Sequence, residues 1–442
     1  MGRLRWLLRF DMVKNITLGT VERNLRLMNL EKYSIGVGDR FAHQGQAQLR
    51  ALLMAKERGI DVVPVWNKSH REHNATGTSP GDVRREADEA VKALGWSGSY
   101  YVDADHISIK NVDLFMDSSD FFTIDVADFI GQPAGEGEVR NFVRRQGKYM
   151  GDLEIPALGK SFSVTKDQIA DIGRRFLKAI KEAGRIHRHI EAAKGEGNFI
   201  AEVSMDETES SQTPVEMFFI LAAIADEGIP AQTIAPKFTG RFNKGVDYAG
   251  DVDQFAEEFE SDVAVIALAV KEFGLPENLK LSVHSGSDKF SIYEPIRRII
   301  RKHGAGLHLK TAGTTWLEEL IGLAMAGGEG LVIAKEIYRT ALERFDELRA
   351  PYSAVIDIDE SRIPSPETMD GWTGEDYANA LRHDPSRESY NPSFRQVLHI
   401  AYKVAAEMGE RYLNALEEFK DVIGENVTEN IYQRHLMKVF AG

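Results

Sequence analysis

The sequence contains no cysteine among its 442 residues. Disulfide bonds, thiolate metal sites and cysteine nucleophiles are therefore excluded. Any metal bound by this chain must take histidine, aspartate, glutamate or water as its ligands. Such ligands suit a divalent cation such as zinc, manganese, nickel, iron or cobalt, and the sequence does not choose among them.

An excess of positive charge is also absent, because 68 acidic residues outnumber 54 basic ones and the formal net charge is -14. Without a basic stripe to neutralise phosphates, we expect no nucleic-acid partner. A small anionic substrate is still compatible, since salt screens distant charges from a local cluster of arginine and lysine. The sequence therefore favours a small-molecule partner.

Long hydrophobic runs are missing as well. The apolar stretch within residues 1–11 is too short to span a membrane, and no small-residue cleavage site follows it. We interpret residues 1–11 as a leader, with Met12 as an alternative start. We expect a cytoplasmic protein with no membrane partner.

What the sequence does contain is a large apolar fraction, 43% of the residues. Short apolar runs alternate with helical stretches such as 46–58, 81–94, 214–227 and 252–273, and Thr213 is placed to cap the third. The runs predict eight strands: 33–38, 61–66, 99–102, 121–125, 199–204, 231–236, 281–284 and 306–310. This alternation predicts an α/β fold, a (β/α)8 barrel of the TIM type. A doubly wound open sheet is the competing fold, but no Gly-x-Gly-x-x-Gly turn follows the first strand.

The chain divides into a barrel over residues 12–350 and a C-terminal helical extension over 351–442. Residues 131–165 are rich in glycine and basic side chains. We interpret them as an insertion after the fourth strand that could act as a lid. The extension is expected to contain long helices over 393–419 and 427–440.

Polar residues alternate with apolar ones in the last two predicted strands. Ser282 and His284 share one face of the first, and His308 and Lys310 share one face of the second. A histidine at the carboxyl end of a strand suits metal binding or proton transfer better than it fills a core. Each histidine would equally fit a hydrogen-bonded core position.

Reactive residues of such barrels lie at the carboxyl ends of the strands. Polar side chains gather at most of these ends: Asp39, Arg40, Asp105, His106, Asp125, Glu202, Ser204, Asp206, Glu207, Lys237, His284, His308 and Lys310. Structural explanations stay open, such as helix caps, ion pairs, turns and a surface lysine. The outlying histidines are expected on solvated helix faces: His187, His189, His303, His399 and His435.

Several motifs resemble the tagaturonate epimerase family. They cover nearly the whole chain from about residue 12: 33–41 (YSIGVGDRF), 103–107 (DADHI), 202–207 (EVSMDE), 237–240 (KFTG), 282–290 (SVHSGSDKF), 308–314 (HLKTAGT), 383–386 (HDPS) and 390–393 (YNPS). The resemblance implies a metal-dependent enzyme of hexuronate catabolism that interconverts D-tagaturonate and D-fructuronate. Some relatives also epimerise the ketohexoses fructose and tagatose.

The implied reaction constrains the mechanism. The inverted carbon, C4 of the ketose, is β to the ketone, so enolisation does not make its C–H acidic. Cleavage of C3–C4 by a retro-aldol step, rotation of the aldehyde and re-addition would invert it. Oxidation at C4 would need a nicotinamide, and no dinucleotide fingerprint is visible. We therefore favour the retro-aldol route.

Strand-end positions suggest roles for individual residues in the reaction that the resemblance implies. The predicted metal ligands are His284, His308 and Glu202, with Asp105 or His106 completing the set. The predicted catalytic residues are Asp206 and Asp288 as proton carriers, together with Glu202. The predicted substrate contacts are Lys237, Lys310, Arg144 and Lys148 for the carboxylate, with Ser285, Asp39 and Arg40.

Two other functions fit the same residues. In an aldolase, Lys237 would form a Schiff base and the two fragments would be released. A non-catalytic sugar-acid binding protein would hold the substrate without turnover. Chelation, borohydride trapping on Lys237 and substitution of His284 would distinguish the three.

Overall fold

The computed structural model describes residues 28–208, 210–311 and 314–442. The predicted leader, residues 1–11, lies outside these ranges. Within them, every helix is either too short or too polar to span a lipid bilayer.

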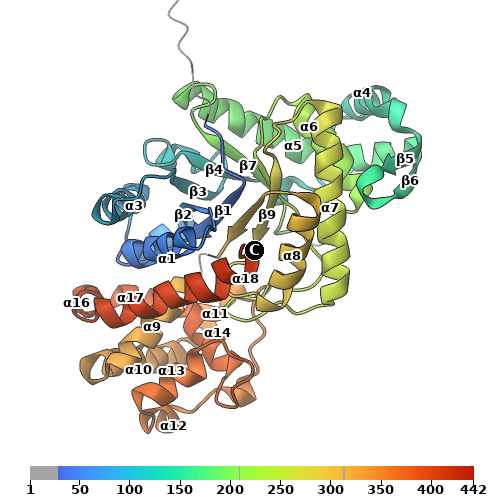
Figure 1. Ribbon diagram of the computed structural model, residues 1–442. Coiled ribbons are helices and arrows are strands. Elements are labelled where there is room, and N and C mark those ends of the chain that lie inside the picture. The colour runs from blue at the N-terminus through green and yellow to red at the C-terminus, as the bar shows by residue number, and fades with distance from the viewer. Residues whose placement is uncertain (1–27, 209, 312–313) are drawn as a thin grey trace, which may run out of the picture.

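Eight parallel strands close into a barrel, which confirms the predicted (β/α)8 fold (Figure 1). Around the barrel the order is β1, β10, β9, β8, β7, β4, β3 and β2. The strands are β1 (Tyr33–Val37), β2 (Val63–Ser69), β3 (Tyr101–Ile107), β4 (Phe121–Asp125), β7 (Ile200–Ser204), β8 (Thr233–Ala235), β9 (Lys280–His284) and β10 (Leu307–Lys310). Because β3 continues to Ile107, Asp105 and His106 lie inside a strand and not in the loop after it.

Helices cover the outside of the barrel, as the sequence predicted. They are α1 (Gly45–Glu57), α2 (His70–Thr76), α3 (Pro80–Leu94), α5 (Lys166–Lys194), α6 (Pro214–Asp226), α7 (Val252–Phe273), α8 (Phe290–His303) and α9 (Thr314–Ala326). A 3₁₀ turn, Val112–Phe115, joins β3 to β4. Thr213 caps α6 as expected: its hydroxyl accepts from the N–H of Glu216, and the Glu216 carboxylate accepts from the N–H of Thr213.

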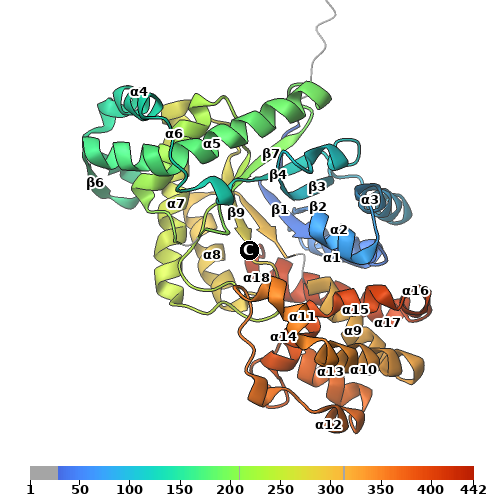
Figure 2. The same cartoon turned by 180° about the vertical axis from the view of Figure 1, so that it is seen from behind.

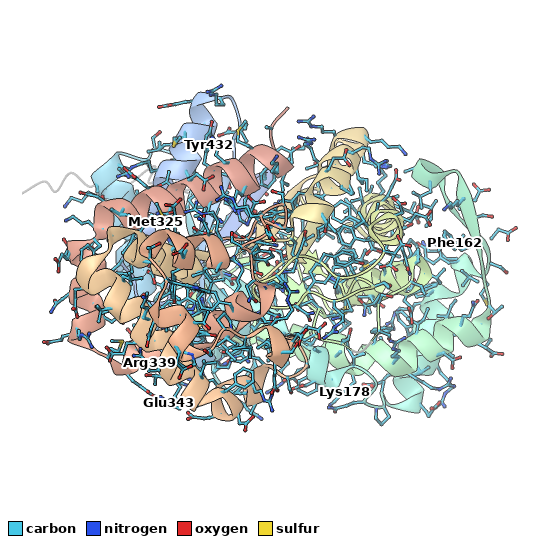
Figure 3. All side chains as sticks on the ribbon, turned by 90° about the horizontal axis from the view of Figure 1, so that it is seen from below. Phe162, Lys178, Met325, Arg339, Glu343 and Tyr432 are labelled. Carbon is cyan, nitrogen blue, oxygen red and sulfur yellow. The ribbon has the colours of Figure 1, made fainter. Side chains whose placement is uncertain are left out.

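The insertion after β4 forms α4 (Glu136–Gln146) and an antiparallel hairpin, β5 (Gly151–Ile155) with β6 (Lys160–Val164). It packs on the outer face of the barrel helices, where the ring of Tyr149 lies 4.9 Å from that of Phe218 on α6. In Figure 3, Phe162 of the hairpin and Arg339 of the extension lie at opposite ends of the molecule. The insertion is therefore a flank of the barrel and not the lid that the sequence suggested.

The helical extension lies below the carboxyl ends of the strands in the views of Figures 1 and 2. Its helices are α10 (Gly328–Glu343), α11 (Phe345–Arg349), α12 (Pro366–Asp370), α13 (Gly374–Leu381), α14 (Pro392–Ile400), α15 (Tyr402–Glu407), α16 (Glu410–Glu418), α17 (Lys420–Glu429), a π-helical segment (Asn430–Leu436) and α18 (Met437–Val439). With α10 and α11 included, the helices that follow the barrel begin before the predicted boundary at residue 351. The long helix predicted over 393–419 is three helices instead. Gly409 has a φ of 57°, a left-handed conformation that interrupts the helix between α15 and α16.

The contact between α9 and the extension is close and contains a buried carboxylate. A Cβ at Gly322 would come within 2.6 Å of the Cα of Ile423 on α17, so only glycine allows this approach. Nearby, one oxygen of Glu318 accepts a hydrogen bond of 3.0 Å from the amide of Asn430. Burial raises the pKa of Glu318 to about 7, although Arg395 and Arg382 oppose the shift.

This carboxyl group should make stability depend on pH. Between pH 4.5 and 7 the folded chain keeps a proton on Glu318 that the unfolded chain has released, so raising the pH favours unfolding. The contribution of Glu318 to the free energy of unfolding is fully present below pH 4.5 and is lost by about pH 7. The loss amounts to about 3 kcal/mol. The free energy of unfolding, measured with urea, should fall less between pH 5 and pH 8 in Glu318→Gln than in the wild type. As a control, substitution of an exposed glutamate, Glu375→Gln, should leave the decrease between pH 5 and pH 8 as large as in the wild type. An equal decrease in the two variants would contradict the prediction.

Candidate active site

A cavity of about 330 Å³ opens at the carboxyl ends of the barrel strands. Its volume is at the lower end of the range for small-molecule sites. The barrel and the extension both line it: Arg40, Asn67, Ser69, His70, Arg71, Glu72, Asp105, His106, Asn111, Asp206, Glu207, Lys244, His284, Gly286, Lys310, Tyr352 and His399. Polar side chains dominate this lining, as suits a hydroxylated, charged ligand.

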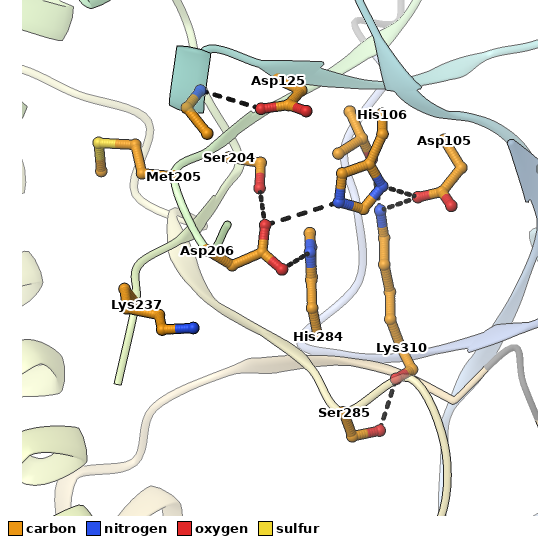
Figure 4. A network of polar contacts seen from close by, with 12 residues as sticks. Asp105, His106, Asp125, Ser204, Met205, Asp206, Lys237, His284, Ser285 and Lys310 are labelled. Carbon is orange, nitrogen blue, oxygen red and sulfur yellow. Dashed lines mark hydrogen bonds and ion pairs between the residues drawn. The ribbon is translucent and has the colours of Figure 1, made fainter. Parts of the chain in front are cut away.

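Two histidines and one carboxylate meet in this cavity (Figure 4). Nε2 of His106 lies 3.5 Å from one oxygen of Asp206, and Nδ1 of His284 lies 3.1 Å from the other. One ligand atom from each residue lies within 4.8 Å of the other two. Two imidazoles and a carboxylate from separate strand ends are a set that could hold a divalent cation.

The second nitrogen of each histidine is held by a carboxylate. Nδ1 of His106 lies 2.8 Å from Asp105, and Nε2 of His284 lies 2.8 Å from Glu202. A carboxylate behind an imidazole fixes its orientation and increases its basicity toward a metal. Asp105 and Glu202, which the sequence suggested as ligands, contact the histidines and lie outside the group that could hold a metal.

A local irregularity of β3 allows Asp105 and His106 to reach the same cavity. Successive residues of a regular strand point to opposite faces, so Asp105 alone would face the barrel interior. The pairing of β3 with β4 shifts register between Ala104 and Ile107, and His106 has φ of 52°. This bulge turns His106 inward at a backbone cost of about 1–3 kcal/mol. Backbone strain of this kind is typical of functional positions.

The free nitrogen atoms fit a cation. Across the described residues, Nε2 of His106 and Nδ1 of His284 have no hydrogen-bond partner of good geometry. Burial lowers the pKa of both rings, yet Asp105 raises that of His106 well above its usual value, and Asp206 raises that of His284. A potential that favours a proton on these nitrogens also favours a metal, which would displace the proton.

Lys310 neutralises the carboxylates behind the histidines. Its ammonium lies 2.9 Å from Asp103 and 3.0 Å from both Asp105 and Glu202. Burial lowers the pKa of Lys310, but the carboxylates raise it well above its usual value, so the amine stays protonated. Burial alone would raise the pKa of Glu202, and Lys310 and His284 lower it far below normal. Glu202 and Asp105 therefore stay ionised, whereas burial raises the pKa of Asp103 to about 7.

Comparison with known proteins identifies the relatives of this chain. The sequence model of a family described as UxaE, tagaturonate epimerase, matches residues 23–439. The chain belongs to the tagaturonate epimerase family. It is 30% identical over 417 residues to the tagaturonate/fructuronate epimerase of Thermotoga maritima, covering 91% of this chain and 80% of that protein. Family membership makes it a carbohydrate epimerase, an enzyme of the isomerase class.

Solved structures of the family have the same fold. The crystal structure of a fructuronate-tagaturonate epimerase from Cohnella laeviribosi with one glycerol matches with a TM-score of 0.76 and 23% identity. The match covers 93% of this chain and 82% of that chain. Its native crystal structure matches with a TM-score of 0.73, again at 23% identity and the same coverage.

His308 lies outside the group that could hold a metal. Along β10 it precedes Lys310 by two residues, so it sits about 7 Å deeper in the barrel. Its Nδ1 lies 2.8 Å from the hydroxyl of Ser34, and burial lowers its pKa to about 3. The predicted ligand is therefore a neutral core histidine, the alternative that the sequence left open. His106, which the sequence also suggested as a ligand, belongs to the group that could hold a metal.

Asp288, a predicted proton carrier, is sealed in the interface between barrel and extension. It is fully buried, and Arg395 of α14 donates to it at 2.9 Å. Nitrogens of His383 and His435 lie 3.4 and 3.3 Å from its oxygens. These contacts give Asp288 a structural position away from the cavity lining. His435, expected on a solvated helix face, is fully buried there.

Arg144 and Lys148, predicted to bind the substrate carboxylate, lie on the flanking insertion. Lys148 is 3.8 Å from Glu272, and both side chains are largely exposed. Lys310, another predicted carboxylate ligand, already lies among carboxylates that would repel a further anion. Lys237 alone of these four cations keeps a position open to substrate, in a hollow that adjoins the main cavity.

The remaining predicted contacts divide between structure and site. The carboxylate of Asp39 accepts four backbone N–H groups, of residues 41–44, and so orders the loop before α1. Ser285 donates to the carbonyl of Lys310 at 2.6 Å and also borders the hollow of Lys237. Arg40 lines the main cavity. It is the predicted contact that the structure places best.

The sequence missed the residues that come from outside the strand ends. Arg71 on α2, Lys244 after β8, and Tyr352 and His399 of the extension all line the cavity. His399 was expected in solvent, but it is only 2% exposed. Its helix, α14, is buried along most of its length. The apolar residues within 393–400 were the feature of the sequence from which this burial could have been predicted.

Proposed function

We propose that this chain interconverts D-tagaturonate and D-fructuronate at a divalent metal held by His106, Asp206 and His284. The convergence of three ligand atoms within 4.8 Å, each histidine backed by a carboxylate, is the observation that carries this proposal. The family assignment supports the reaction, and the chemistry of the ligand set supports a cation. The cytoplasmic location remains a prediction from the sequence.

A cation in this position would supply Lewis-acid stabilisation of the negative charge that develops on the ketone oxygen, worth several kcal/mol. The chain itself must take the proton from the C4 hydroxyl as C3–C4 breaks. Glu207 lines the cavity beside Asp206 and is outside the ligand set, so we assign it this role. The aldehyde then rotates, re-adds from its other face and takes the proton back, which inverts C4.

The metal requirement has a direct test. After treatment with a strong chelator and dialysis, the protein should lose its metal by elemental analysis and lose epimerisation of tagaturonate by NMR. Zinc, manganese, cobalt, nickel or iron, added separately, should restore the activity. In D2O the restored enzyme should retain the hydrogen on C4, because a retro-aldol step never breaks that C–H bond.

Other outcomes would select other functions. Full activity in metal-free protein would contradict the proposal. Borohydride trapping of the substrate on Lys237, with activity indifferent to chelation, would indicate the Schiff-base aldolase. Exchange of the C4 hydrogen with solvent would exclude the retro-aldol route even if the metal is required.

A further inference from the structure

A second group of side chains in the cavity has an unused capacity to bind an anion. Arg40, Arg71, Lys244 and His399, together called the cationic cluster, all line the same cavity as the histidines and Asp206. They come from the β1–α1 loop, from α2, from the β8–α7 loop and from α14 of the extension. None of them contributes to the candidate metal group.

The charges of the cluster are only partly neutralised. Arg40 is 7% exposed and pairs with Glu72 at 3.2 Å through Nη2. Within the described chain, its Nε and Nη1 have no hydrogen-bond partner. For Arg71 and Lys244, the same part of the chain offers no carboxylate within ion-pair distance. Glu72 and Glu207 are the carboxylates that act on this cluster, so its three cations keep an excess of positive charge in a protein of net charge -14.

His399 adds a neutral donor to this group. It is 2% exposed, and among the described residues neither ring nitrogen has a hydrogen-bond partner. Burial, together with Arg40 and Lys244, lowers the pKa of His399 well below its usual value, so the ring is uncharged. A buried imidazole with two unsatisfied nitrogens costs free energy unless a ligand bonds to it.

The extension holds the cluster in place. The backbone N–H of Lys244 donates to the carbonyl of Val355 at 2.7 Å, and the amide of Gln396 donates to the carbonyl of Lys244 at 3.0 Å. The guanidinium groups of Arg40 and Arg71 lie over the rings of Tyr402 and Tyr352, 4.4 and 5.1 Å from their centroids. Rigid support of this kind is what a charge-recognition site needs.

We propose that the cationic cluster binds the carboxylate of the substrate and thereby selects uronates over neutral ketohexoses. The inference rests on the proposed function and adds a second anchor to it. When C3–C4 breaks, the carboxylate belongs to the aldehyde fragment. Holding the carboxylate therefore keeps that fragment in the cavity while its carbonyl turns and rejoins the enediolate.

Calorimetric binding to the metal-loaded enzyme tests this assignment without relying on turnover. The double variant Arg71→Gln/Lys244→Met should bind an equilibrated tagaturonate/fructuronate mixture at least 10-fold more weakly than the wild type. Its affinity for D-tagatose, which lacks the carboxylate, should change less than 2-fold. The epimerisation assay on the same samples should show a raised KM for tagaturonate and release of dihydroxyacetone.

The matched control carries the same two substitutions elsewhere. Arg144→Gln/Lys148→Met removes equal charge from the flanking insertion and should leave both affinities unchanged. A uronate affinity that survives Arg71→Gln/Lys244→Met would overturn the assignment, and so would equal weakening by the control. Absence of epimerisation in the wild type would refute the proposed function, whereas selective loss of uronate binding would still support the cluster.

Discussion

Replacing His284 with alanine should lower kcat/KM by about 10³-fold or more, because a Lewis acid worth ~4 kcal/mol would be lost from the transition state. His284 offers one of the three candidate ligand atoms and lies between Asp206 and Glu202. The measurements are the epimerisation rate by NMR and the metal content after dialysis. Both should fall together.

Two further variants separate metal binding from general damage. Glu202→Gln keeps an acceptor behind His284 but loses the charge, so we expect a smaller loss of metal affinity, about 10- to 100-fold. His303→Ala removes a histidine that pairs with Glu260 away from the cavity and should leave activity intact. Full metal occupancy and activity in His284→Ala would contradict the assigned ligand set.

Replacing Asp288 with asparagine should destabilise the fold more than any change considered above, by about 3–5 kcal/mol. Burial would raise the pKa of Asp288, but Arg395, His383 and His435 hold it well below its usual range, so the carboxylate is charged. Without that charge, the guanidinium of Arg395, which is fully buried, loses its counter-ion. Urea unfolding of the metal-free protein followed by circular dichroism would measure the loss.

The exposed pair of Asp384 and Arg387 provides the comparison. Asp384→Asn breaks an ion pair of 2.9 Å on the surface of the same extension, and surface pairs contribute about 0–1 kcal/mol. Equal destabilisation by the two substitutions would show that the buried group has no special role. Because Asp288 follows His284 by four residues, its variant should also lower activity at temperatures well below unfolding.

The barrel was predictable because its strands carry a strong local signal. The run 121–125 is mostly apolar and the run 281–284 alternates apolar and polar residues, and strands β4 and β9 lie there. Strand ends were less predictable. β3 runs to Ile107 because its bulge continues the pairing past Ala104, and no periodic pattern announces a bulge.

The site was predicted in part. His106 and His284 were predicted as metal ligands and belong to the group that could hold a metal, whereas Asp206, the third member, was predicted as a proton carrier. His308 was predicted at the cavity because it shares a strand face with Lys310. Residues on one face of a strand lie at different depths in the barrel, and the alternation of apolar and polar residues does not show which of them reaches the cavity. Asp288 lies in the same sequence motif as His284, residues 282–290. Its partners, however, lie more than ninety residues further along the chain, at His383, Arg395 and His435.

The sequence by itself determined the fold class, the family and the kinds of ligand atom available, because these depend on local periodicity, motif and composition. Only the tertiary structure decided which carboxylates stand behind the histidines, which cations face the cavity and what the extension contributes. Those choices depend on barrel closure, which sets the layer of each side chain, and on packing that brings α14 to the strand ends. Neither is encoded within one segment of the chain.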